Sequence, residues 1–440
     1  MDERPLNPQD SEWRDILQFT QIFRAFRVAI RPSKLLLALA ALLFMYAGGR
    51  LLDLMWPQKY IDQGYMVRND VLTIFSTVAS PFASFQHDEI NNFGTLTANV
   101  LSWNWSFPGG VPEATARFVL QTPLEYWLGN KVFFSILFAW FLVVWAFFGG
   151  AIARIAAIHV ARDEVISPIR AMKFSAKAFP SFLAAPLIPF IMVLVLGVIV
   201  SLLGLLLYIP YVGPIAAGLI LIVPLVLGIL MMLLTVGCIA GSGLMYPTIA
   251  TEGSDAFDAV SRALSHVFAA PWRLLFYSAI ALGYGAVTYF FVRICVFVML
   301  WLVHFFMGWF LVGDASATWM AMWPTPSLEK MAYAPDWSVL NSSGDTAAAI
   351  ASFWIYLSIS LMGAYVISFY FSASTIIYLL MRRKVDAAEM DQVYLEPADE
   401  VLPDTGAEPE GAITPKTPAP ASPTTDTPGT QAGEPPIANA

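Results

Sequence analysis

The sequence predicts an all-α integral membrane protein: a six-helix transmembrane bundle with interfacial amphipathic helices and a disordered C-terminal tail. Three observations predict this fold class. Hydrophobic residues make up 58% of the 440 residues and charged residues only 13%, whereas soluble domains average about 45–50% and about 25%. Six apolar runs are long enough for a helix to cross the hydrocarbon core, which takes about 20 residues. Basic residues gather at alternate connections between these runs.

The predicted spans are residues 35–55, 132–153, 182–207, 214–244, 274–306 and 348–381. The fifth run is longer than one crossing needs. Arg293 follows Arg273 by 20 residues, which is about 30 Å along a helix, so Arg293 is expected at the far interface. Residues 295–310 are then expected to bend onto the membrane surface. The sequence leaves open whether 274–306 is one kinked span or a span followed by an interfacial helix.

The basic residues also predict the orientation, because they favour the cytoplasmic side of short connections. Basic residues precede the first span and follow the last: Arg24, Arg27, Arg31 and Lys34 at one end, Arg382, Arg383 and Lys384 at the other. The connection 208–213 has no basic residue, and 313–347 has only Lys330. This pattern predicts a multipass protein of the cell (inner) membrane with N- and C-termini in the cytoplasm.

Three amphipathic stretches precede outward-going spans. Residues 1–34 are predicted to contain a cytoplasmic interfacial helix that ends at Pro32. Residues 166–179 and 256–268 have the same pattern before Pro180 and Pro271. We therefore predict a repeated unit of interfacial helix, proline and outward span. The alternative is that every junction between a loop and a span attracts amphipathic residues, a proline and a base.

The remaining segments lie outside the transmembrane domain, residues 35–381. Two extracytoplasmic segments, 57–131 and 313–347, are rich in Trp, Tyr and Phe, which suits a cap at the level of the lipid headgroups. Residues 385–440 are rich in Pro, Thr, Ala and Glu. Such a segment buries too little apolar surface to offset its ordering entropy, so a disordered cytoplasmic tail is predicted.

The sequence contains no catalytic, cofactor-binding or metal-binding signature. The four histidines lie in different segments without ligand spacing, and no phosphate-binding loop or nucleophile motif is present. A net charge of −8 argues against nucleic acid as a partner. The residues His87, Asp88 and Glu89 are the one polar triplet that could bind a cation or serve a lipid-modifying enzyme, although adjacent helical residues do not face each other.

Two further sets of residues are candidates for roles inside the membrane. Four are ionisable: Arg50, Asp53, Arg293 and His304. Such groups are functional candidates by default, but anchoring at the interface is the favoured interpretation here. Gly237 and Gly241 form a GxxxG pair that Gly243 continues, and small residues let helices approach closely in lipid. Packing within the chain is favoured over a homodimer face.

One local segment resembles a known kind of protein. Glu252-Gly253-Ser254, followed by Ala256, Ala259, Arg262 and Ala263 and then Trp272-Arg273-Leu274-Leu275, is similar to a module of poorly characterised bacterial multipass membrane proteins. These include the membrane domain of some glycerophosphodiester phosphodiesterases. The resemblance covers about 30 residues and none of the catalytic part, so it implies an accessory membrane domain in a bacterium.

These features favour a non-enzymatic multipass membrane scaffold or accessory protein. Its expected partners are the lipid bilayer and either other proteins or further copies of itself. The alternative is a transporter or channel for a small or lipidic solute, which would need polar groups around a cavity near mid-membrane. Candidates for such groups are Ser201, Thr235, Ser242, Ser278, Thr288 and Ser358. The sequence specifies neither a partner nor an oligomeric state.

Overall fold

The computed structural model describes residues 18–56, 81–328, 333, 335–336 and 338–395. The chain divides into two compact units, Met1–Tyr394 and Leu395–Ala440, and all the described helices belong to the first. No strand occurs within the described residues. Of the predicted disordered tail, 385–440, residues 396–440 lie outside them, whereas residues 385–395 are described and bind to the rest of the chain. Residues 1–17 of the predicted N-terminal segment and residues 57–80 of the first extracytoplasmic segment also lie outside the described residues.

Among the described residues, six helices are long and apolar enough to cross a membrane, which confirms the predicted number of spans. They are α3 (Pro32–Met55), α7–η4–α8 (Lys131–Arg162), α11–η5 (Leu187–Tyr208), α13 (Ile222–Glu252), α15 (Pro271–Gly308) and α17 (Ser342–Val385). Within the second span, α7 covers Lys131–Val144, the π-helical turn η4 covers Trp145–Gly149, and α8 covers Gly150–Arg162. The predicted fourth run is divided, because α12 (Val212–Ile220) is separate from α13.

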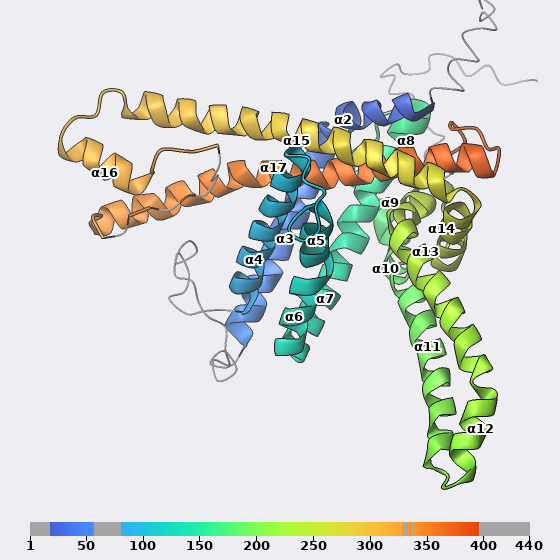
Figure 1. The fold of residues 1–440 in the computed structure, drawn as a ribbon. Helices are drawn as coiled ribbons and strands as arrows, with labels where there is room; N and C mark the ends of the chain where they lie inside the picture. Colours follow the sequence, from blue (N-terminus) through green and yellow to red (C-terminus); the bar gives the residue numbers. More distant parts are fainter. Residues whose placement is uncertain (1–17, 57–80, 329–332, 334, 337, 396–440) are drawn as a thin grey trace, which may run out of the picture. The chain divides into compact units, whose positions relative to one another are not determined.

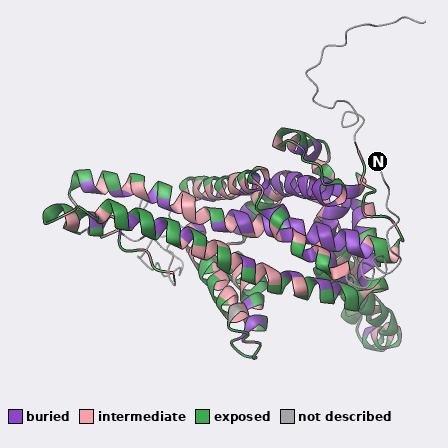
Figure 2. Cartoon of the chain, turned by 90° about the horizontal axis from the view of Figure 1, so that it is seen from above, coloured by how far each residue is buried: buried purple, intermediate pink, exposed green. Residues whose placement is uncertain are grey.

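The spans share a packed core only at one end, which we call the hub. It consists of residues 150–160 of α8, 244–251 of α13 and 371–381 of α17, nearly all of them buried. These three helices all pack against one another. Away from the hub, α11 buries only Pro189. Figure 1 shows α11 and α13 extending from the hub as one pair and α15 and α17 as another, and Figure 2 shows the buried residues concentrated where the pairs meet.

Glycines allow the close approach at the hub. A Cβ atom at Gly149 would lie 2.7 Å from the Phe371 ring of α17, and one at Gly150 would lie 2.5 Å from the Ser175 hydroxyl. Both distances are shorter than real Cβ contacts, so any larger residue would displace these neighbouring side chains. The Ser175 hydroxyl donates to the carbonyl oxygens of Ala146 and Phe147 in η4 (3.1 and 2.6 Å), where the π-turn changes the usual helical bonding.

The three amphipathic stretches form helices whose apolar faces contact the protein. They are η1–α2 (Gln18–Phe23 and Arg24–Ala29), α9 (Pro168–Lys177) and α14 (Ala256–Ala269). Helix α9 packs on α8, α14 packs on α13, and α2 packs on α17. Each span that returns to the hub therefore has an amphipathic helix beside it, and for the last span that helix comes from the N-terminal end of the chain.

Local sequence explains where these helices begin and end. Pro32, Pro168 and Pro271 are the first residues of α3, α9 and α15, where a missing N–H costs nothing. Helix α13 ends at Gly253, whose φ of +65° is the left-handed conformation that favours glycine. The chain turns there into α14, whose first turn is capped by the Asp255 side chain accepting from the Asp258 N–H (2.8 Å).

The GxxxG pair lies in the contact between α13 and α14. A Cβ at Gly237 would lie 2.5 Å from Leu264, and one at Gly241 would lie 3.2 Å from Val267. Both glycines of α13 therefore face α14. Gly243, the third residue of the set, faces Ser374 of α17 at 3.4 Å. All three glycines therefore pack against other helices of the same chain.

The fifth span differs from the prediction that residues 295–310 bend onto the surface. Helix α15 is one unbroken α-helix of 38 residues. It continues because it packs along α17, which is itself 44 residues long, and because residues 274–306 contain neither proline nor a helix-ending glycine motif.

We call the parts of the spans away from the hub, and the elements that connect them there, distal. The distal elements between spans are α4 (Pro81–Leu101), α5 (Val111–Ala116), η3 (Arg117–Gln121), α6 (Thr122–Gly129) and α16 (Asp314–Met322). Helix α10 (Phe179–Ala184) lies next to α9.

Replacing Gly237 with Leu should separate α13 from α14, because the new side chain meets Leu264 and Phe268. Overpacking of this kind costs about 1–3 kcal/mol. The measurement is unfolding of the purified protein in mixed micelles with increasing SDS. Gly228→Leu is the matched control, since it lies on the same helix and a Cβ there meets nothing within 4 Å. Equal stability of the two variants would contradict the packing role of Gly237.

Candidate functional site: the polar cluster at the hub

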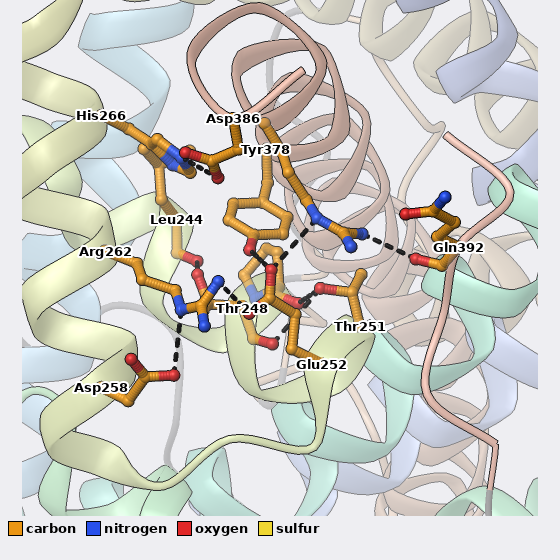
Figure 3. Close-up of polar contacts among 12 residues, drawn as sticks. Leu244, Thr248, Thr251, Glu252, Asp258, Arg262, His266, Tyr378, Asp386 and Gln392 are labelled. Atoms are coloured by element: carbon orange, nitrogen blue, oxygen red, sulfur yellow. Dashed lines mark hydrogen bonds and ion pairs between the residues drawn. The ribbon is translucent and has the colours of Figure 1, made fainter. Parts of the chain in front are cut away.

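The carboxylate of Glu252 is the centre of a polar cluster at the end of α13 (Figure 3). It is only 11% exposed and accepts from three side chains. The Tyr378 hydroxyl donates to Oε1 at 2.5 Å, the Arg262 Nη1 lies 2.8 Å from Oε2, and the Arg382 Nε lies 3.2 Å from Oε1. One carboxylate therefore joins α13 to α14 and, through two residues, to α17.

Arg262 extends the cluster to the exposed side of α14. Its Nε donates to Asp258 Oδ2 at 2.9 Å, one turn earlier on the same helix. Partial burial works toward a lower pKa for Arg262, but the nearby Glu252 and Asp258 carboxylates outweigh it and raise that pKa. The guanidinium is therefore permanently charged, and it serves as a fixed link between an exposed carboxylate and a shielded one.

Residues 386–394, which we call the return segment, fold back over the same end of α13. The Tyr394 N–H donates to the Thr251 carbonyl at 2.7 Å, and the Arg382 Nη1 donates to the Gln392 carbonyl at 2.6 Å. The first of these bonds satisfies one of the carbonyl groups that a helix leaves unpaired at its C-terminus. Asp386 Oδ2 lies 3.0 Å from Nε2 of His266, which is 1% exposed.

Deeper in the hub, two buried basic side chains join other helices. Arg154 of α8 donates to the Ala250 carbonyl of α13 at 2.8 Å, and its guanidinium carbon lies 4.3 Å from the centre of the Phe174 ring of α9. Lys34 of α3 is fully buried, and its Nζ lies 2.8 Å from Ser372 Oγ of α17. These contacts place a polar partner opposite each buried nitrogen group, as an apolar environment requires.

The polar cluster around Glu252 resembles a structural link between helices more than a catalytic site. The Glu252 carboxylate is bonded to three donors from the chain, and those donors come from two other helices, α14 and α17. Within the described residues, no group of three or more His, Cys, Asp and Glu residues could hold a metal ion. The cluster therefore holds α13, α14, α17 and the return segment together.

The structure places Arg50 and Asp53 together near the distal end of α3. Arg50 Nη1 lies 3.7 Å from Asp53 Oδ2, and Arg50 Nε donates to the Tyr46 hydroxyl at 3.2 Å. Asp53 Oδ1 also accepts from the Phe82 N–H at 3.0 Å. Since Phe82 is the second residue of α4, Asp53 holds the start of that helix against α3.

Arg293 and His304 lie on the distal half of α15, and both donate to backbone carbonyls. The Arg293 Nε and Nη2 lie 3.2 and 2.9 Å from the Leu328 carbonyl. His304 is buried, with Nε2 2.9 Å from the Trp323 carbonyl and its ring in contact with the rings of Trp319 and Trp323. Both residues tie the segment after α16 to α15.

The triplet at residues 87–89 lies on α4 and is not assembled as one site. Asp88 accepts from the Tyr126 hydroxyl at 2.6 Å and lies 3.4 Å from His87. Glu89 is half-buried, and its Oε1 has no hydrogen-bond partner. Burial, with a smaller contribution from Asp88, raises the pKa of Glu89 to about 7.

Sequence reasoning did not select the residues of the hub cluster. Glu252 entered through the local resemblance, and Lys34 and Arg382 served only as basic residues that predict the orientation. Tyr378 gave no signal in the sequence. The contacts join residues up to 338 positions apart, as between Lys34 and Ser372, so spacing along the chain could not reveal them.

The fold and the hub define the class: a multipass α-helical membrane protein whose returning spans are joined by a polar cluster at one end. Comparison with protein-family models, with curated proteins and with solved structures found no match to this chain.

Replacing Glu252 with Gln should destabilise the hub by about 2–3 kcal/mol, because the shielded Arg382 and the more exposed Arg262 lose the counter-charge that they share. The measurement is the free energy of unfolding in SDS titrations. Asp258→Asn is the control: it removes an exposed partner of the same Arg262, and an exposed pair of this kind contributes below about 0.5 kcal/mol. A loss with Asp258→Asn as large as with Glu252→Gln would refute the central role of Glu252.

The raised pKa of Glu89 predicts that α4 loses stability with rising pH. The folded state favours protonated Glu89, so this contribution is fully present below pH 4.5, the ordinary value, and is lost as the pH rises to about 7. Protection factors for residues 81–101 in hydrogen exchange should therefore be higher at pH 5 than at pH 8. Glu89→Gln should remove the difference, and Glu125→Gln, at an exposed site on α6, should leave it. A slope unchanged in Glu89→Gln would contradict the assignment.

Proposed function

We propose that this protein is a non-enzymatic scaffold or accessory protein of a cell membrane. The observation that carries the proposal is the Glu252 cluster, in which one carboxylate joins three helices and its donors are all used within the chain. A hub fixed in this way is suited to presenting surfaces in a constant arrangement. Its central carboxylate, Glu252, is shielded and bonded to groups of the same chain.

The surface offered at the hub is charged. Because the apolar side of α9 is buried through Ala171 and Phe174, Lys173 and Lys177 remain exposed. We propose that this side faces the cytoplasm of a bacterial cell, as the distribution of basic residues predicts. With Cys238 and Cys295 replaced by Ser, an impermeant thiol reagent on intact cells should label Tyr211→Cys in the distal turn and spare Ser265→Cys on α14. The reverse pattern would exclude this orientation.

Transport is the less favoured alternative. The hydroxyl groups that could line a path donate to carbonyls of their own helices, as in Ser201 to Gly197 (2.9 Å), Thr235 to Met231 (2.8 Å) and Ser358 to Trp354 (2.9 Å). Ser242 and Thr288 do the same. Side chains bonded in this way contribute little polarity to a pathway for solute.

The scaffold proposal predicts a stoichiometric protein partner that binds at the hub. The full chain, cross-linked in cells and purified in a mild detergent, should retain that partner, and Lys173→Glu should reduce its recovery several-fold. Lys131→Glu makes the same charge change at the distal start of α7 and should have no effect. A chain that purifies alone under all these conditions, or equal losses with both variants, would overturn the proposal.

A further inference from the structure

The length of α15 requires that part of it lies outside the hydrocarbon core. Its 38 residues extend about 57 Å at 1.5 Å per residue. A core about 30 Å thick accommodates about 39 Å of helix even at a tilt of about 40°, the upper end of the observed range. The surplus is about 18 Å, or roughly three turns. Since Arg273 and the hub cluster occupy the first end of α15, the surplus falls at the distal end.

The surface of this distal end is unlike one that faces water. Residues 294–313 contain no Asp, Glu, Lys or Arg. Five aromatic side chains are exposed there, which we call the aromatic face: Trp301, Phe305, Phe306, Trp309 and Phe310. Phe310 is 89% exposed and Phe306 62%. A contiguous apolar surface of this kind marks a site of interaction.

The polar groups near this face do not need water. Arg293 donates to the Leu328 carbonyl and His304 interacts with the Trp323 carbonyl. Both contacts lie within the distal arm, by which we mean the distal halves of α15 and α17 together with α16 and the segment that follows it. The arm has its own small core behind the face, including Leu300, Trp319 and Ile355. It can therefore keep its structure while its outer surface is in contact with lipid.

The aromatic face is better suited to lipid than to a second copy of the chain. Its rings stack on one another, Trp301 on Phe305 at 5.2 Å and Phe306 on Trp309 at 5.7 Å. Close packing of helices in a membrane uses small residues. Gly308, the one glycine among the aromatic residues 301–310, faces the same chain: its Cβ would lie 3.2 Å from the Trp319 ring. Tryptophan, by contrast, collects at the headgroup boundary.

We propose that the aromatic face is a lipid-docking surface that rests at the boundary between headgroups and acyl chains, on the side of the membrane away from the hub. The α15–α17 pair then crosses the membrane with a strong tilt, and its distal arm is held at the surface. The proposal depends on the membrane class of the protein and not on the scaffold function.

The test uses the full chain with Cys238 and Cys295 replaced by Ser, reconstituted in vesicles of phosphatidylcholine and phosphatidylglycerol. Single nitroxide labels are introduced at Phe306→Cys and Phe310→Cys. Two controls define the scale: Ser338→Cys, exposed on the same arm beside Asp336, and Leu202→Cys, exposed on the apolar helix α11. Collisions with oxygen and with a water-soluble nickel complex report the depth of each label.

The labels at 306 and 310 should lie between the two controls in depth, with several-fold less access to nickel than the label at 338. Nickel access equal to that at 338, or a depth equal to that at 202, would overturn the proposal. Spin–spin broadening together with cross-linking between chains would also overturn it, in favour of a second copy.

A second measurement avoids the label. In the native chain, lipids brominated near the headgroup should quench tryptophan fluorescence more than lipids brominated near the chain ends. Replacing both Trp301 and Trp309 with Phe should reduce that shallow quenching, while replacing the buried pair Trp319 and Trp323 with Phe should not. An unchanged shallow signal in the first variant would count against the aromatic face as the lipid contact.

Discussion

The close contact of α8, α13 and α17 at the hub is the constraint on which the rest of the structure depends. Gly149 and Gly150 remove the side chains that would keep α17 and α9 away from this region. Once the helix backbones are so close, the polar groups between them are cut off from water and must find partners in the chain. Lys34, Arg154 and Glu252 are satisfied in this way, each by a residue of another helix.

The hub also determines the role of the amphipathic helices. Such helices commonly lie on a bilayer with the apolar side in lipid, but here α2, α9 and α14 use that side against the returning spans. Their charged sides are then left for other contacts. The same order of elements occurs three times, as an amphipathic helix, an outgoing span and a returning span, and the first helix of the chain packs on the last span. This correspondence is the structural basis for considering a repeat.

The distal parts of the spans are organised differently from the hub. There, α11 and the outer half of α13 bury almost none of their side chains, whereas α15 and α17 build a second small core with α16. Ionisable groups in the distal parts are bonded locally, Asp53 to the start of α4 and Arg293 to the segment after α16. The two ends of the protein therefore differ: the hub contains a cluster of charged groups, and the distal parts have apolar and aromatic surfaces.

The sequence by itself determined the class of the protein and the number of spans. Apolar runs of about 20 residues and prolines at helix starts are local properties, and burial in lipid requires little more than length and composition. The tertiary structure alone decided that α15 continues without a bend, because its packing along α17 supports the helix past Arg293. It also decided that the GxxxG pair receives α14 and that Glu252 joins three helices. These outcomes depend on contacts between residues far apart in the chain, and no local pattern encodes which distant side chain will supply a buried charge with its partner.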